Sequence, residues 1–504
     1  PAEFIRKLLQ KAGFAADEPI FVSGETKLCK WKGDLFREII REFNLPPSKI
    51  LHVGDNYHAD FLMPKKYGLR AWHFDEWHSV MQKKIAKVTT HTDYNSLLIG
   101  SVWRGHVAKS LVLAQVPHED ELQRLGYEVF GPLFTGFLLW LIKKFKEDKP
   151  EVVLCLARDS YPFYKLLTEN TMRFKLNMPI KYAYCSRASV FVPAFSELSH
   201  HRLWYLIGGM EAMTARERLK RLGLSVEKLE GDLMRAGLQP DEVTKGGDPR
   251  VYTFLLQHFP ALLQRKSEEI ILIRRYFGQI IGSARRIAIV DVGWNGTIQY
   301  SLSRLLIDKN LRLQGYYMAL LDPNMEPPFF DHSMTGWLTS GNQVNSWREV
   351  FLSGGAVLVE LVSVAPHGLV LKFEEKDGEV VPVLEDLKQR KEEQHYIAFG
   401  QRIREGALRF AREVLEDLVT DPEEVANLSS EQWAEPFKRF ILSPTPKEAK
   451  LFLNLTHAGA PTDSKPRTNI LVKLPFRDRV LPWVVSEQEK NVIWKAGFRA
   501  LNRF

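Results

Sequence analysis

The first hundred residues alternate between helical and extended hydrophobic patterns. Residues 3–13 and 33–43 repeat apolar side chains at helical spacing, which predicts two amphipathic helices. Short apolar runs at residues 19–23, 50–53 and 69–74 predict strands. Because the strands alternate with helices of this length, we predict a parallel sheet with crossover helices.

A second α/β pattern begins near residue 150. Its apolar runs predict four strands, at residues 151–157, 180–185, 286–290 and 312–321. The pattern is helical before these strands, over residues 107–148, and mainly helical in an insertion over residues 196–280.

A helical pattern returns after residue 380. Residues 384–418 predict one long amphipathic helix, and residues 430–456 predict two shorter ones. The tail from about residue 460 is basic and rich in Pro, which predicts an extended arm. We therefore predict an α/β protein with three regions: a partial Rossmann-like sheet in 1–95, a larger α/β domain in 106–380, and a mostly helical region in 381–504.

Composition and charge narrow the class of protein. The 504 residues are 45% hydrophobic and 26% charged, which excludes wholesale disorder and fibrous repeats. The net charge of +8 is spread along the chain without a dense basic stripe. It therefore indicates a phosphate-bearing substrate or weak contact with an anionic surface, and no specific nucleic acid partner.

The cysteines and the apolar stretches indicate the compartment. Cys29, Cys155 and Cys185 form no CxxC pair and no disulfide framework, which is typical of the reducing cytosol. The longest uncharged apolar stretch, residues 129–142, is shorter than the roughly 20 residues that span a bilayer. We expect a cytoplasmic protein without a transmembrane segment, at most peripheral at the inner membrane face.

Two carboxylates follow the predicted strand 50–53. Asp55 leaves its carboxyl end, and Asp60 comes five residues later. Carboxylates at this edge of a parallel sheet suit Mg²⁺, and Lys30, in the loop before the preceding helix, can neutralise a phosphate there. The alternative is structural, since Gly-Asp-Asn is a good turn, Asp is a good helix N-cap and most loop lysines are only solvated.

These residues carry a resemblance to a known family. FVSGETKLCKWKGDLF followed by ILHVGDNYHADFLMPKKYGLRAWHF resembles the C-terminal half of a haloacid-dehalogenase (HAD) superfamily phosphohydrolase domain, over roughly residues 1–80. The resemblance implies that Lys30 binds phosphate, Asp55 binds Mg²⁺ and Asp60 supports it. It also implies an aspartyl-phosphate intermediate that water hydrolyses, with a sugar phosphate or related metabolite as substrate.

The chain departs from that family at its first two motifs. The family's nucleophile is the first Asp of a DxD motif, and its second motif ends a strand with Ser or Thr. Neither precedes Lys30 here, because Ser23 stands on the predicted strand immediately before the lysine loop. We expect both motifs to lie before Pro1, and we expect this chain by itself not to complete the reaction.

Three strand ends of the second domain carry polar motifs. Arginines there can clamp a phosphate or carboxylate with two hydrogen bonds, and a glycine loop that opens a helix can present N–H groups to an anion. The predicted substrate-binding residues are Arg158, Asp159, Arg187, Asp291, Gly293, Asn295, Gly296 and Thr297. His367, in a loop between apolar runs, is a further candidate. Each also has a structural alternative, as a helix cap, an ion-pair partner, a turn residue or a surface histidine.

The order of the motifs suggests wider resemblances. It is similar to a group of large bacterial HAD-like proteins associated with surface polysaccharide synthesis, some of them fused to glycosyltransferases, which implies polysaccharide-assembly proteins as partners. The loop VDVGWNGT also resembles the ribose-phosphate loop of phosphoribosyltransferases, although Val290 stands where a second acid is usual.

Three functions follow as hypotheses. The first is a Mg²⁺-dependent HAD-type phosphohydrolase. The second is a glycosyl- or phospho-transferase, or a nucleotide-sugar-binding domain, in residues 106–380. The third is a non-catalytic scaffold of a polysaccharide-assembly complex.

Overall fold

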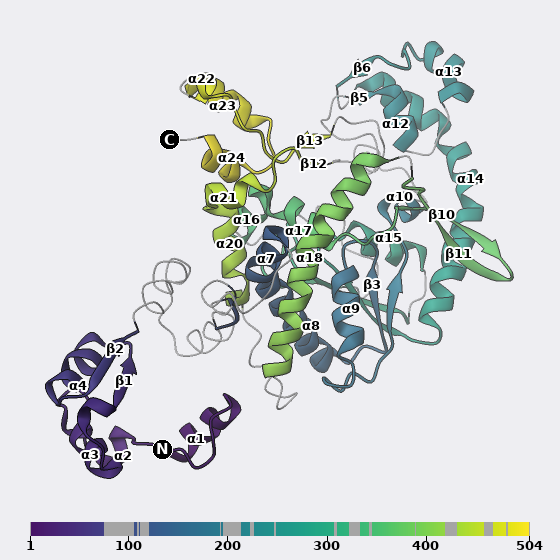
Figure 1. The fold of residues 1–504 in the computed structure, drawn as a ribbon. Coiled ribbons are helices and arrows are strands. Elements are labelled where there is room, and N and C mark those ends of the chain that lie inside the picture. Colours follow the sequence, from purple (N-terminus) through teal and green to yellow (C-terminus); the bar gives the residue numbers. More distant parts are fainter. Residues whose placement is uncertain are drawn as a thin grey trace. The chain divides into compact units, whose positions relative to one another are not determined.

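The chain forms two compact units (Figure 1). The computed structural model describes residues 2–74, 105–107, 110, 120–191, 193–194, 213–221, 226–245, 248–306, 310–321, 333–341, 345–388, 390–418, 431–457, 467–479 and 482–502. Residues 2–74 belong to unit 1, and the described residues from 105 onward belong to unit 2.

Unit 1 is a small α/β fold. Its elements are α1 (Ala2–Lys11), α2 (Ser23–Thr26), α3 (Asp34–Phe43), η1 (Pro47–Lys49), β1 (Leu51–Gly54), η2 (Tyr57–Leu62), α4 (Met63–Lys66) and β2 (Arg70–His73). β1 and β2 pair in parallel, with Leu51 opposite Arg70, as the hydrophobic pattern predicts. Phe36, Met63 and Leu69 form the core beside them.

The prediction of a strand at residues 19–23 is wrong. Residues 19–22 form neither helix nor strand, and Ser23 begins α2. The Val22 carbonyl accepts hydrogen bonds from the Glu25 and Thr26 amides, so it starts a helical turn rather than a ladder.

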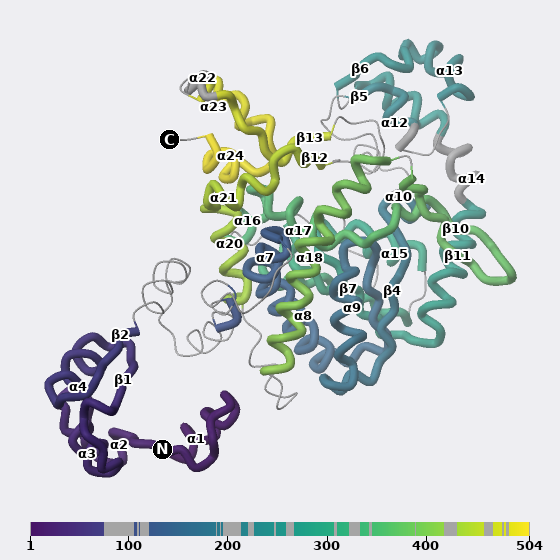
Figure 2. Tube along the Cα trace, viewed as in Figure 1, coloured from purple at the N-terminus to yellow at the C-terminus, as the bar shows by residue number. Residues whose placement is uncertain are grey.

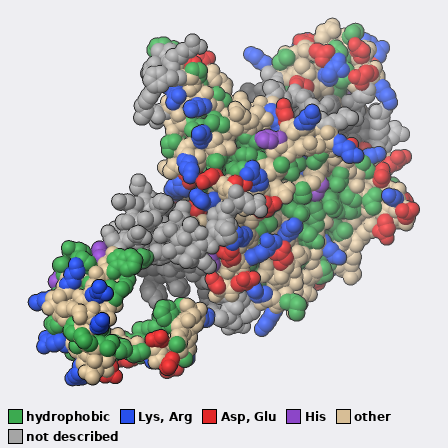
Figure 3. All heavy atoms as spheres, in the orientation of Figure 1, with side chains coloured by type: hydrophobic (Ala, Val, Ile, Leu, Met, Phe, Trp, Pro, Cys, Tyr) green, Lys and Arg blue, Asp and Glu red, His purple; other side chains and the backbone are tan. Residues whose placement is uncertain are grey.

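One face of the unit 1 sheet exposes large apolar side chains. Leu51, Val53 and Trp72 are 56%, 50% and 61% exposed. Leu51 and Val53 alternate along β1, so they point to the same face. Figure 3 shows hydrophobic side chains on the surface of unit 1. Parallel sheets are normally covered on both faces, so this part of unit 1 resembles a fragment of a larger sheet.

Unit 2 is built on a five-stranded parallel sheet in the order β4-β3-β7-β8-β9. The strands are β3 (Val152–Leu156), β4 (Ile180–Ala183), β7 (Arg286–Asp291), β8 (Arg312–Tyr317) and β9 (Ser333–Gly336). The first four confirm the predicted strands, and β9 is an addition. Every residue of β3 is buried, as expected for a central strand with both faces covered.

Two long helices pack together beside this sheet (Figure 2). One is continuous from Glu121 to Asp148 and comprises α7 (Glu121–Leu125), η4 (Gly126–Phe130) and α8 (Gly131–Asp148). The other is α18 (Lys391–Leu418). The first helix is long and apolar enough to span a membrane, but 94% of its apolar window is buried inside the structure. Packing within unit 2 therefore accounts for its apolar surface.

The helical insertion begins with a short ladder between β5 (Met213–Thr214) and β6 (Val243–Thr244). Its helices are α12 (Ala215–Arg221), α13 (Val226–Arg235) and α14 (Pro249–Ile281). β10 (Val370–Lys376) and β11 (Glu379–Leu384) form an antiparallel hairpin that packs against α14. The hydrophobic pattern did not predict this hairpin.

The remaining elements complete unit 2 around the sheet. They are α9 (Tyr161–Glu169), α10 (Arg187–Val190), α15 (Thr297–Leu305), α16 (Ser346–Val350), η5 (Phe351–Gly355), α17 (Ala356–Ser363), η6 (Glu431–Ala434), α20 (Glu435–Leu442), α21 (Pro446–Lys450), β12 (Thr456–His457), β13 (Thr468–Asn469), α22 (Phe476–Arg479), α23 (Pro482–Lys490) and α24 (Lys495–Asn502). The predicted extended arm is wrong for the described part of the tail, which is largely helical. Trp494 explains this, because it is fully buried and its indole N–H donates to the Ile441 carbonyl at 2.8 Å.

Glycines let the two long helices approach closely. A Cβ on Gly406 of α18 would lie 1.9 Å from the Gln123 carbonyl oxygen of α7. We predict that Gly406→Ala lowers the free energy of unfolding of unit 2 by about 1–3 kcal/mol, because neither backbone can move away cheaply. Gly278→Ala in α14 is the control. A Cβ there meets nothing within 4 Å, so we expect no loss of stability, or a gain of up to about 1 kcal/mol. Equal denaturant midpoints for the two variants would contradict this packing.

Candidate functional site

In unit 1, the predicted lysine and the second carboxylate are in contact. The Lys30 ammonium donates to Asp60 Oδ1 at 2.6 Å, and His52 Nε2 lies 2.9 Å from the same oxygen. The Asn56 amide donates to Asp60 Oδ2 at 3.0 Å. Burial alone would raise the pKa of Asp60, but these donors outweigh it and the pKa is lowered. Asp60 is therefore an ionised anchor that positions Lys30.

Asp55 lies beside this anchor at the carboxyl end of β1, where it is exposed. Gly54, which immediately precedes Asp55, is required by packing, since a Cβ there would lie 2.4 Å from Asp60 Cγ. Both Asp60 oxygens already accept hydrogen bonds, and of the two carboxylates Asp55 is the one exposed to solvent at the strand end, where a cation reaches it. Within the described residues, no group of three or more His, Cys, Asp or Glu side chains converges on a metal position. Mg²⁺ would thus need further oxygen ligands besides Asp55.

In unit 2, four predicted residues gather at the carboxyl edge of the sheet. Arg158 and Asp159 follow β3, Arg187 follows β4, and Asp291 ends β7. β3 pairs in parallel with both β4 and β7, so these strands end together. Asp159 interacts electrostatically with both arginines, and Asp291 interacts with Asp159 and Arg187.

The backbone around Arg187 is fixed by serines. The Ser186 hydroxyl accepts a hydrogen bond from the Ser189 amide at 3.1 Å, and the Ser189 side chain accepts one from the Ser186 amide. The Ser186 hydroxyl also donates to the Val370 carbonyl at 2.6 Å. Arg187 is the first residue of α10 and its side chain is exposed. Among the described residues, no group hydrogen-bonds to its guanidinium.

The structure adds a third carboxylate, Glu360 of α17, which sequence reasoning missed. Its Oε1 accepts a hydrogen bond from the Trp294 indole N–H at 2.7 Å, and its Oε2 lies 3.8 Å from His457 Nε2. On the far side of the His457 ring, Nδ1 lies 3.0 Å from the Tyr396 hydroxyl. Burial lowers the pKa of His457 to about 4, so this histidine is neutral at pH 7.

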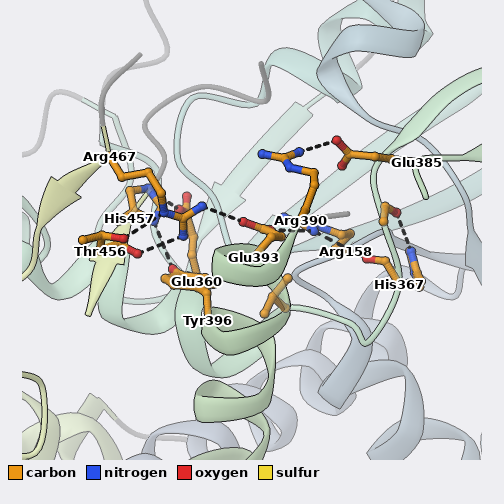
Figure 4. A network of polar contacts seen from close by, with 12 residues as sticks. Arg158, Glu360, His367, Glu385, Arg390, Glu393, Tyr396, Thr456, His457 and Arg467 are labelled. Atoms are coloured by element: carbon orange, nitrogen blue, oxygen red, sulfur yellow. Dashed lines mark hydrogen bonds and ion pairs between the residues drawn. The ribbon is translucent and has the colours of Figure 1, made fainter. Parts of the chain in front are cut away.

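A charged chain links the sheet edge to the C-terminal elements (Figure 4). Glu393 of α18 accepts a hydrogen bond from Arg158 at 3.1 Å and one from Arg467 at 3.2 Å. Only 9% of the Glu393 side chain is exposed. Burial raises the pKa of this carboxyl, but the two arginines outweigh burial and the pKa is lowered. The Arg158 guanidinium is therefore paired with Glu393. The Arg187 guanidinium has no ion-pair partner among the described residues and is available to a ligand.

His367 supports Arg158 from the other side. Its carbonyl accepts a hydrogen bond from Arg158 at 3.4 Å, and its Nε2 lies 2.9 Å from the Tyr182 hydroxyl. Burial lowers the pKa of the imidazole. His367 thus lies next to the site, as the sequence suggested, but in a packed position behind Arg158.

The three carboxylates at the edge repel one another. Burial and the neighbouring Glu360 raise the pKa of Asp159 to about 7, although Arg158 and Arg187 oppose this rise. Burial, followed by Asp159, raises the pKa of Asp291 well above its usual range, and burial raises that of Glu360. All three side chains keep some exposed surface. A carboxyl pKa raised to near neutral pH, as at Asp159, is typical of acid–base residues of active sites.

The glycine loop has a structural explanation in the fold itself. A Cβ on Gly293 would lie 2.4 Å from the Ala319 carbonyl oxygen, and one on Gly296 would lie 2.3 Å from Met334 Sδ. The close approach is therefore to strands of the same sheet. Asn295 is half-buried in this loop, and Thr297 begins α15. The Thr297 hydroxyl is buried without a hydrogen-bond partner among the described residues.

Comparison with known proteins found no match. No protein-family model matches the chain, and no curated protein is similar enough to match. The contacts described above therefore carry the functional argument.

Glu393 offers a direct test of the charged chain. We predict that Glu393→Gln lowers the free energy of unfolding by about 3 kcal/mol at pH 7, because it removes the buried carboxylate charge that the Arg158 and Arg467 guanidinium groups share. The folded-state pKa of Glu393 is depressed, so its contribution is complete at neutral pH and disappears as pH falls below about 4.3. The difference between the two proteins should shrink over that range.

The neighbouring Glu392 is the matched control. It is 74% exposed and also pairs with Arg467, at 3.3 Å. Glu392→Gln should cost at most about 1 kcal/mol. Chemical denaturation of both variants between pH 7 and pH 3.5 makes the comparison, and equal losses would contradict the special role of Glu393.

Proposed function

We propose that the intact protein is a HAD-type, Mg²⁺-dependent phosphohydrolase that acts on a sugar phosphate or related metabolite. Unit 1 supplies its phosphate-binding Lys30 and its cation-binding Asp55. The contact between Lys30 and the buried Asp60 beside the end of β1 carries this proposal. The bare face of the unit 1 sheet supports it, because the rest of such a domain would cover that face.

In this function the residues of unit 1 bind and orient phosphate. Asp60 holds the Lys30 ammonium at the strand end, where its charge balances that of a phosphoryl group. Mg²⁺, when bound, would neutralise further charge on the phosphoryl oxygens, and Asp55 is the residue present to hold it. We further propose that the protein works in the cytoplasm, with polysaccharide-assembly proteins as partners.

The reaction needs a nucleophile from outside the described residues. We predict that the 504-residue chain alone shows no Mg²⁺-dependent hydrolysis of p-nitrophenyl phosphate. In a polypeptide that also supplies the family's nucleophile motif, Lys30→Met and Asp55→Asn should each lower activity about 100-fold or more. Lys32→Met, at an exposed lysine of the same loop, should leave it unchanged. Hydrolysis by the chain alone that Asp55→Asn abolishes would contradict the expectation that this chain lacks the nucleophile. Full activity of the completed polypeptide after both Lys30→Met and Asp55→Asn would overturn the proposed function.

A second function is favoured for unit 2 by one specific observation. Arg187 is exposed and has no hydrogen-bond partner within the described residues, and it stands among three carboxylates at a parallel sheet edge. Ligands of open α/β sheets bind at this edge. We propose that unit 2 binds a phosphorylated sugar or nucleotide-sugar there, as the donor of a glycosyl- or phospho-transfer.

Binding of inorganic phosphate tests the unit 2 function. We predict that Arg187→Gln weakens binding about tenfold or more, because a charge-assisted hydrogen bond is lost. Lys181→Gln, at an exposed cation of the preceding strand, should bind as the unaltered chain does. Loss of ligand binding in Asp291→Ala, while circular dichroism shows that the fold survives, would also favour the unit 2 function. Isothermal titration calorimetry measures each affinity. If the unaltered chain binds no phosphate, the result favours the hypothesis of a non-catalytic scaffold.

A further inference from the structure

Arg187 and Asp159 stand at the carboxyl ends of neighbouring parallel strands, after β4 and β3 respectively. They carry opposite charges and interact electrostatically. Nevertheless, no ion pair or hydrogen bond joins them in the described part of unit 2, and no donor there reaches the Asp159 carboxylate. Both side chains retain solvent-accessible surface. An exposed guanidinium and a half-buried carboxyl group at adjacent strand ends, neither of them hydrogen-bonded within that part of the chain, are both available to one ligand.

Charged and titratable groups from eight elements lie at this sheet edge or next to the groups that form it. They are Arg158 after β3, Asp291 of β7, Glu360 of α17, Glu393 and Tyr396 of α18, Tyr182 of β4, His367 before β10, His457 of β12 and Arg467 before β13. Two of the arginines are bound to Glu393. The remaining carboxylates outnumber the remaining cation, Arg187, so a bound anion needs one or more of them to be protonated.

We propose that one phosphate group of the ligand bridges Arg187 and Asp159, and that it binds together with a proton. The guanidinium donates to two phosphate oxygens, and protonated Asp159 donates its O–H to a third. The proton comes from solvent, so complex formation consumes it, and release of the ligand returns it. This inference rests on the phosphate-binding function proposed for unit 2.

The surroundings favour a neutral Asp159 in the complex. Its pKa of about 7 already permits protonation at neutral pH. A bound phosphate adds negative charge beside the carboxyl group and raises that pKa further. Binding should therefore be strongest below pH 7 and should weaken as pH rises above it. The direct alternative, an ionised Asp159 that accepts a ligand hydroxyl, predicts no proton uptake.

Sulfate is the probe, because it has the shape of phosphate and does not itself titrate between pH 6 and pH 8.5. Calorimetric titrations of the 504-residue chain at pH 7.5, in two buffers of different ionisation enthalpy, measure the protons bound. We expect uptake of up to about one proton, and an affinity that falls about tenfold per pH unit just above pH 7. Uptake indistinguishable from zero overturns the inference.

Variants assign the proton to Asp159. Asp159→Asn keeps a donor in place of the O–H, so we expect it to bind sulfate within about threefold of the affinity of the unaltered chain at pH 6, without pH dependence. Asp377→Asn, at a turn residue with positive φ that asparagine tolerates, should keep the pH dependence. Undiminished pH dependence of sulfate binding in Asp159→Asn overturns the assignment. If that variant fails to fold, the proton uptake measured with the unaltered chain still tests the inference.

The two proposals can fail separately. If Arg187→Gln removes sulfate binding, but binding to the unaltered chain takes up no proton, the inference is refuted and the unit 2 function stands. No sulfate or phosphate binding by the folded chain refutes both. If Arg187→Gln changes neither sulfate binding nor proton uptake, the anion binds elsewhere and the inference is also refuted.

Discussion

The contact on which unit 2 depends is the pair of arginines bound to Glu393. Arg158 follows the central strand β3, Glu393 lies in the first turn of α18, and Arg467 precedes β13. One carboxylate thus joins three segments that are distant in sequence. Removing any member would leave buried charge behind, so the three segments are held in one arrangement. The arrangement also determines which arginine of the sheet edge is available to a ligand.

The same edge holds an electrostatic conflict. Glu360 raises the pKa of both Asp159 and Asp291, Asp159 raises that of Asp291, and burial disfavours the charge of all three. A fold selected for stability alone would not gather them. Local conflicts of this kind concentrate at functional sites, where the rest of the structure tolerates their cost. The unit 1 site differs, because the hydrogen-bond donors around Asp60 stabilise its negative charge and lower its pKa.

The sequence predicted the elements that depend on local pattern. Both strands of the unit 1 sheet and four of the five strands of the unit 2 sheet follow from apolar runs. Parallel pairing then places Arg158, Asp159, Arg187 and Asp291 at one edge without further information. The sequence placed Lys30 and Asp60 at the same strand end, but their direct contact is a finding of the structure. The glycine loop was interpreted as a close approach to an anion, but a residue type alone does not say what approaches, and here it is the chain itself.

What the sequence could not predict depends on long-range packing. Glu360, His457 and Arg467 belong to no motif, and they reach the site only because α17, β12 and β13 pack beside it. The helices of the tail were missed because Trp494 finds its hydrogen-bond partner on α20, more than fifty residues away in sequence. Such contacts leave no periodic signal.

The central claim is that the carboxyl edge of the unit 2 sheet binds an oxyanion. The most direct measurement is a crystal structure of the chain with bound tungstate, whose anomalous signal locates the anion. The account predicts tungsten between Arg187 and Asp159. Tungsten ordered only at other positions in unit 2 would contradict it. A tungstate at full occupancy that Arg187 does not contact would contradict it as well.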